Sequence, residues 1–143
     1  MRIVKAFGWI PIPVFKSKPP GDFRGYTKLL LVAIFPVGWI KIHPDFWDDE
    51  HILVHELQHV EDFLRNPFRY WRGYKFDEVE RAFYESRAYA RQYVSYPESE
   101  RTVKKFNLFV ALIHTKYNLT KYSPILIANI LNYEISLLES GID

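Results

Sequence analysis

The pentad His-Glu-Leu-Gln-His at residues 55–59 lies inside a stretch whose apolar residues recur with the period of an α-helix. Leu53, Leu57, Val60 and Leu64 form one apolar stripe, and both histidines lie away from it. Side chains four positions apart share one face of a helix. A helix at this position therefore presents two imidazoles and a glutamate away from its apolar stripe.

Both ends of this helix are marked in the sequence. Asp48 and Asp49 are N-cap candidates, and Glu50 adds an acid to the first turn. The pair Asn66-Pro67 ends the helical pattern. The stretch between these residues is therefore predicted to be one complete helix.

The two histidines and the glutamate indicate a zinc site. Two neutral imidazoles one helical turn apart can hold a divalent zinc ion, so His55 and His59 are predicted metal ligands. Glu56 is the predicted catalytic residue, because it can take a proton from a water molecule on that ion. The alternative is a pair of surface histidines without a metal. The chain has no cysteine, which leaves histidine and carboxylate side chains as its strong zinc ligands.

A catalytic zinc ion needs a third protein ligand and one open position for water. The pattern HExxHxxGxxH is absent, because Asp62 and Arg65 occupy the places of its glycine and third histidine. The third ligand is therefore expected farther along the chain, on a second helix predicted from Asp77 to about Tyr93.

Three glutamates of this second helix are candidate ligands. Glu80 fits a capping box with the helix start, and Glu78 lies in the first turn, where the helix dipole favours an acid. Glu85 lies mid-helix between Ala82 and Ala88, and small side chains there allow close packing of another helix. We predict Glu85 as the third ligand, with Glu78 as the alternative.

The pentad, the 25 residues that follow it and the Glu-x-x-Ala-Tyr sequence at residues 85–89 resemble the gluzincin group of zinc metallopeptidases. Segments 38–44 and 66–74 are similar to small, largely uncharacterised members from bacteria and phages. The resemblance covers roughly residues 26–92. It implies a zincin-like domain that holds one catalytic zinc ion through His55, His59 and Glu85 and hydrolyses peptide bonds.

The chain departs from the larger, thermolysin-like members around the third ligand. Those members have Asn before the ligand glutamate and Asp four residues after it, where this chain has Tyr84 and Tyr89. Asp62 is a candidate for orienting a zinc-bound histidine, and a solvated helix acid is the equal alternative. Candidates for stabilising the oxyanion of the reaction are Tyr70, Tyr74 and His114.

A competing hypothesis is a zinc-binding module without peptidase activity. A fourth protein ligand, such as His43, His51 or Glu78, would close the site to water and support it. Glu56 favours the enzyme, because a structural site needs no glutamate between its ligands. An enzyme held latent by residues 1–25, or by the tail after Gly141, is a further alternative.

The expected fold is α+β: a small N-terminal sheet followed by about four helices, in a single domain over residues 1–143. Residues 1–25 are rich in proline and are expected to form an irregular arm. Two strands are predicted within residues 29–43, joined by a turn at 35–38, with the second strand positioned to pair with an extended substrate. Residues 97–143 are expected to form a helical scaffold, with helices from 97 to about 117 and from 123 onward.

Charge and hydropathy narrow the range of partners. A net charge of +2 does not indicate nucleic-acid binding. The longest apolar region, residues 29–42, is shorter than a membrane span and is broken by proline, glycine and lysine. No signal peptide is evident in the sequence. We expect a soluble cytoplasmic protein with a peptide or protein substrate and an undetermined oligomeric state.

Overall fold

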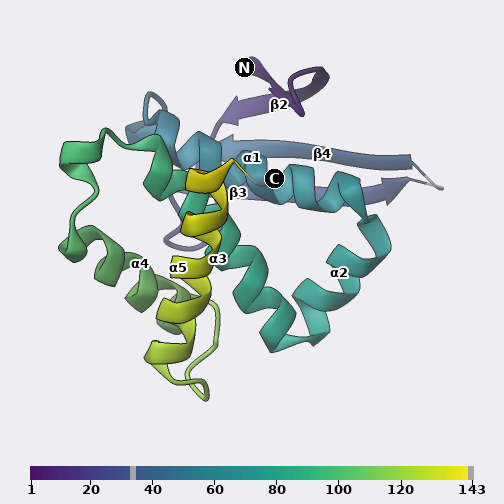
Figure 1. Ribbon diagram of the computed structural model, residues 1–143. Coiled ribbons are helices and arrows are strands. Elements are labelled where there is room, and N and C mark those ends of the chain that lie inside the picture. The colour runs from purple at the N-terminus through teal and green to yellow at the C-terminus, as the bar shows by residue number, and fades with distance from the viewer. Residues whose placement is uncertain (33–34, 142–143) are drawn as a thin grey trace. The chain divides into compact units, whose positions relative to one another are not determined.

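The computed structural model describes residues 1–32 and 35–141. Within these residues, a four-stranded sheet is followed by five α-helices, so the predicted α+β class is confirmed (Figure 1). Contacts between residues divide the chain into two compact units, residues 1–70 and residues 71–143. The prediction of a single domain stays a prediction.

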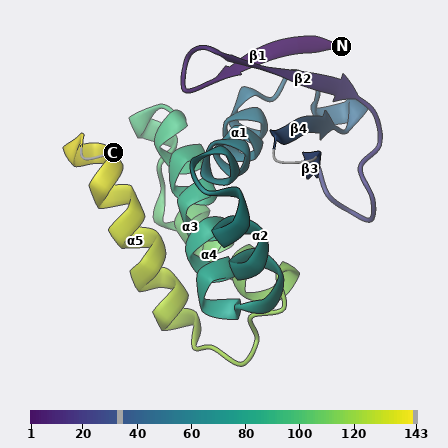
Figure 2. The same ribbon diagram turned by 90° about the vertical axis from the view of Figure 1, so that its right-hand side faces the viewer.

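The first unit contains the sheet. Its strands are β1 (Arg2–Ala6), β2 (Ile10–Lys16), β3 (Gly25–Val32) and β4 (Phe35–Ile42), in the order β1-β2-β4-β3. Strands β1 and β2 form an antiparallel hairpin, which Figure 2 shows from the side, and β3 pairs antiparallel with β4. The two hairpins are joined by a short parallel pairing of residues 14–16 with residues 40–42.

The N-terminal region differs from its prediction. Residues 1–25 are not an irregular arm, because they contain β1 and β2. Pro11 and Pro13 fit within β2 because residues 10–13 pair with β1 alone, and proline is tolerated in a strand with one unpaired side. The predicted turn at residues 35–38 is also wrong, since these residues belong to β4.

Strand β3 forms one edge of the sheet. Strand β4 lies between β2 and β3. The prediction that the second strand of residues 29–43 can pair with an extended substrate is therefore wrong over residues 40–42, which pair with β2. Helix α1 (Glu50–Arg65) packs on β3 and β4, as Figure 1 shows. The core between sheet and helix contains Ile12, Val14, Ile40, Ile42, Leu53 and Val60. This packing fixes the face of α1 that carries the histidines.

The bounds of α1 agree with the sequence prediction. Of the two candidates, Asp49 is the N-cap, and its carboxylate accepts hydrogen bonds from the backbone N–H groups of His51 and Ile52. A helix that was not predicted, α2 (Pro67–Phe76), begins after Asn66, whose side chain accepts from the Arg69 N–H at 3.1 Å. Proline at the first helical position starts a helix as readily as it ends the preceding one.

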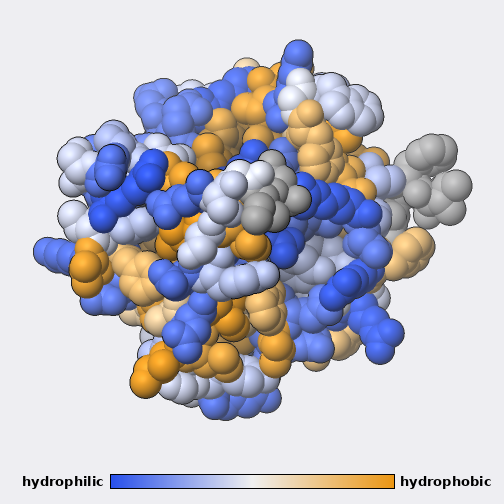
Figure 3. Space-filling model, viewed as in Figure 1, coloured by the Kyte–Doolittle hydropathy of each residue, from blue (hydrophilic) through white to orange (hydrophobic). Residues whose placement is uncertain are grey.

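The second unit is helical. It contains α3 (Glu78–Ser95), α4 (Val103–Lys116) and α5 (Pro124–Ser140), with α3 and α5 running side by side in Figure 2. Their core includes Tyr89, Phe109, Ile113, Ile127 and Leu131. Hydrophobic side chains also reach the surface along α4 and at the start of α5, where Figure 3 shows orange atoms at the lower left.

Helix α4 begins later than predicted. Residues 98–100 form a 3₁₀ turn, and Thr102, rather than Pro97, precedes the helix and caps it through the Lys105 N–H. Helix α5 begins directly after Ser123, in agreement with the predicted start, and Ser123 caps it by accepting from the Ile125 N–H; Gly141 ends the helix with φ of 70°. Within the described residues, no helix is long and apolar enough to span a membrane.

Candidate metal centre

His55 and His59 lie one turn apart on α1, and both side chains are buried. Their Nε2 atoms are 3.3 Å apart. A tetrahedral zinc ion about 2.0–2.1 Å from each nitrogen would separate the two by about 3.3–3.4 Å. The spacing of this pair therefore fits two ligands of one zinc ion.

Tyr70 contacts the second nitrogen of His59. Its hydroxyl lies 3.2 Å from His59 Nδ1, and the tyrosine is buried at the fourth position of α2. A hydrogen bond at Nδ1 fixes the orientation of the imidazole and leaves Nε2 available for a metal. Tyr70 was nominated from the sequence as an oxyanion donor, but its hydroxyl is instead placed to orient His59.

Glu85 is completely buried at the centre of α3, and Ala82 and Ala88 on either side of it are buried as well. The hydroxyl of Tyr74 donates a hydrogen bond to Glu85 Oε1. This donor holds one carboxylate oxygen in a fixed direction. Tyr74, the second nominated oxyanion donor, thus contacts the predicted third ligand.

The ligand atoms of His55, His59 and Glu85 all lie within 4.8 Å of one another. The three buried side chains are therefore close enough to hold a metal ion. Within the described residues, no other histidine or acidic residue joins this group, so His43, His51 and Glu78 lie outside it. Two imidazoles and one carboxylate are a ligand set typical of catalytic zinc, which keeps one position open.

Glu56 follows His55 and is also buried. Its side chain is directed to strand β3, where Thr27 Oγ1 lies 2.6 Å from Glu56 Oε2 and 3.1 Å from the Glu56 main-chain oxygen. The hydroxyl carries a single hydrogen and can donate to either oxygen. Thr27 therefore limits the directions in which the Glu56 carboxylate can point.

Gly25 lets β3 approach Glu56 closely. A Cβ atom at Gly25 would lie 2.6 Å from Glu56 Oε1 and 2.9 Å from the Ile52 side chain. Both distances are shorter than van der Waals contact, so any larger residue would displace Glu56 or the strand. Glycine and threonine at the start of β3 thus form the wall against which the glutamate is held.

Other candidates from the sequence have different partners. Glu78, the alternative third ligand, pairs with Lys121 at 2.9 Å, and this hydrogen bond and the glutamate's charge raise the pKa of Lys121. His114 Nε2 is 3.1 Å from the Tyr122 carbonyl oxygen. Asp62, the candidate for orienting a histidine, is buried and accepts a hydrogen bond from Gln58.

Sequence reasoning missed Thr27 and Gly25. Both precede Glu56 by about thirty residues, and neither residue type indicates a catalytic role by itself. They lie before the predicted strands of residues 29–43, and no periodicity or motif connects them to Glu56. Their role depends on the packing of β3 against α1, which only the structure contains.

Comparisons with known proteins identified no relative. A scan against models of protein families, a search of curated proteins and a search of solved structures each found no match to this chain. The functional assignment therefore depends on the residues of the site.

Proposed function

We propose that the protein is a zinc-dependent metallopeptidase of the gluzincin type, with His55, His59 and Glu85 as metal ligands and Glu56 as the catalytic base. The observation that carries this proposal is the grouping of the three buried ligand side chains within 4.8 Å. The residue beside the first ligand is a glutamate held in place by strand β3. Two imidazoles and a carboxylate that can hold zinc, with a glutamate beside the first ligand, are the groups that zinc-dependent hydrolysis uses.

The roles of the residues follow from their chemistry. A bound zinc ion would lower the pKa of a water molecule towards about 7 and polarise the peptide carbonyl. Glu56 would take the proton of the attacking water and pass it to the leaving amine. Tyr70 and Tyr74 would keep the ligands His59 and Glu85 in the directions that coordination requires.

The second candidate function is a zinc-binding module without peptidase activity. The ligand group favours the enzyme, because three protein ligands leave a coordination position for water, whereas a structural site is closed by a fourth. The placement of Glu56 favours it as well, since a purely structural site has no use for a buried glutamate beside its first ligand.

The experiment that separates the two functions compares zinc-loaded wild type with a Glu56→Gln variant on a fluorogenic peptide library. We expect wild type to cleave some of the peptides. The variant should retain its zinc and lose about 100-fold or more in kcat, because it lacks the base. Equal cleavage by the two proteins would contradict the mechanism. A zinc-loaded wild type that cleaves none of the peptides would favour the non-catalytic module.

A further inference from the structure

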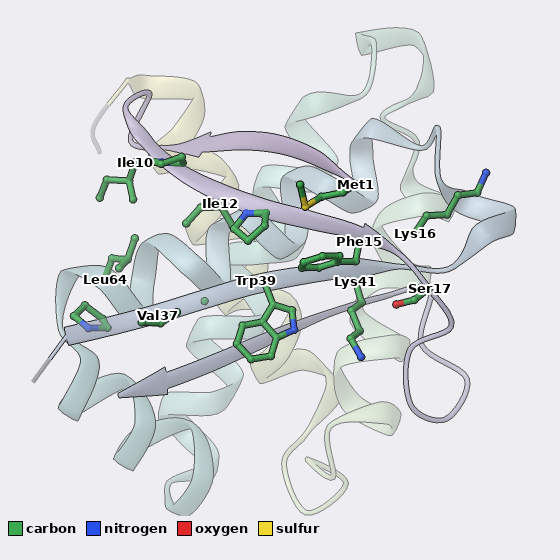
Figure 4. Close-up of a pocket in the computed structure, with 14 residues that line it drawn as sticks. Met1, Ile10, Ile12, Phe15, Lys16, Ser17, Val37, Trp39, Lys41 and Leu64 are labelled. Atoms are coloured by element: carbon green, nitrogen blue, oxygen red, sulfur yellow. The ribbon is translucent and has the colours of Figure 1, made fainter. Parts of the chain in front are cut away.

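A slot in the sheet of the first unit is lined almost entirely by apolar side chains. None of the predicted metal ligands lines it. It lies between β2 and β4, has a volume of about 770 Å³ and reaches Leu64 of α1 (Figure 4). Cavities that bind small molecules have volumes of about 300–1,000 Å³ and mostly apolar walls with a few polar groups. The slot has both properties.

The slot exists because β2 and β4 pair over only part of their length. The parallel register joins residues 14–16 to residues 40–42. If that register continued toward the N-terminal ends, it would pair residues 10–13 with residues 36–39, and all of these residues line the slot instead. Pro11, Pro13 and Pro36 have no backbone N–H, so the missing ladder cannot form in full. For the same reason, the slot is a poor acceptor for an added peptide strand.

One end of the slot is cationic. Figure 4 shows Lys16, Ser17 and Lys41 toward one end, with the Lys16 and Lys41 side chains pointing in opposite directions, and Ile10 and Leu64 at the other end. Lys16 also contacts the Trp47 ring, at 5.9 Å from its centroid. Within the described residues, Lys41 makes no ion pair. Its ammonium group is therefore available to an anion at the mouth of the slot.

The charge of the surrounding segment points to the same kind of ligand. Residues 1–42 contain one acidic residue, Asp22, and the basic residues Arg2, Lys5, Lys16, Lys18, Arg24, Lys28 and Lys41. We propose that the slot between β2 and β4 binds a linear aliphatic chain with a terminal anionic group, with the chain along Ile12 and Trp39 and the anion at Lys41. A long-chain carboxylate is the simplest molecule of this class.

The test uses the full chain and calorimetric titration with decanoate, octanoate, decan-1-ol and acetate. Decanoate has two more methylenes than octanoate, and each buried methylene raises the affinity by up to about fourfold. Decanoate should therefore bind about tenfold more tightly. Acetate should not bind measurably. Lys41→Gln should weaken decanoate binding about threefold and leave decan-1-ol binding unchanged, as expected for a partly exposed ion pair. Lys5→Gln, on the neighbouring β1, is the control.

A second pair of variants tests the location. Val37 lines the slot and is 41% exposed, and Leu30, its direct partner on β3, is 40% exposed and does not line it. Val37→Trp should fill the slot and abolish decanoate binding, whereas Leu30→Trp should bind as wild type does. Decanoate binding that survives in Val37→Trp would overturn the proposal. Binding to phosphatidylglycerol vesicles without binding to monomeric decanoate would also overturn it, in favour of a membrane surface.

Discussion

At the scale of single residues, the position of Glu56 depends on Thr27. We predict that Thr27→Val lowers kcat about tenfold with little change in KM or zinc content, because the variant keeps the shape of the side chain and removes the hydroxyl beside the carboxylate. Thr27→Ser should restore most of the loss. Steady-state kinetics on a cleaved peptide measures both effects. An unchanged kcat in Thr27→Val would show that the hydroxyl does not position the base.

Tyr70 acts on the metal site through His59. We predict that Tyr70→Phe weakens zinc binding about tenfold, because loss of the partner at Nδ1 leaves the imidazole free to turn. Competition with a zinc-sensitive dye measures the affinity. Tyr133→Phe, at an exposed position of α5, is the matched control and should bind zinc as wild type does. Equal affinities for the two variants would mean that Tyr70 contributes packing alone.

At the scale of elements, the cap of α1 stabilises the helix that carries both histidines. We predict that Asp49→Ala lowers the free energy of unfolding by about 1 kcal/mol, because two backbone N–H groups lose their acceptor. Asp48→Ala, at the exposed neighbouring position, should change it by less than about 0.5 kcal/mol. Urea denaturation followed by circular dichroism distinguishes the two. Equal losses would mean that the aspartates act through their charge rather than through a cap.

The elements that could be predicted from the sequence are those with strong local patterns. Helices α1 and α3 have capping residues at their starts, and their bounds were predicted to within about two residues, as was the start of α5. Helix α2 was missed because Pro67 was interpreted only as the end of the preceding helix. Strands β1 and β2 were missed because prolines usually argue against a strand. Prolines are tolerated in β2 because residues 10–13 pair with β1 alone, and this pairing follows from the tertiary structure.

The candidate site was predictable to a similar extent. His55, His59 and Glu56 could be named because their spacing has a direct geometric meaning on one helix. Glu85 was preferred over Glu78 because of its mid-helix position and its small neighbours. Glu85 belongs to the ligand group, while Glu78 pairs with Lys121. The partners Thr27, Tyr70 and Tyr74 could not be assigned, because their roles arise from contacts between different elements.

At the scale of the whole molecule, the proposed metal site takes its ligands from distant parts of the sequence. His55 and His59 lie on α1 and Glu85 on α3, and all three side chains are buried, the Glu85 carboxylate completely. Burial of such a group is costly unless hydrogen bonds or a metal ion compensate for it. A bound zinc ion should therefore stabilise the folded chain, since it binds the folded state in preference to the unfolded one.

The most direct measurement is the zinc content of wild type, His59→Ala and Glu85→Gln after metal loading and equal dialysis, with circular dichroism to show that each protein is folded. We predict one zinc ion per wild-type chain and little in either variant, because each variant lacks one of three ligands. Full zinc retention by folded Glu85→Gln would contradict the ligand set, and a wild type that binds no zinc would contradict the metal site itself.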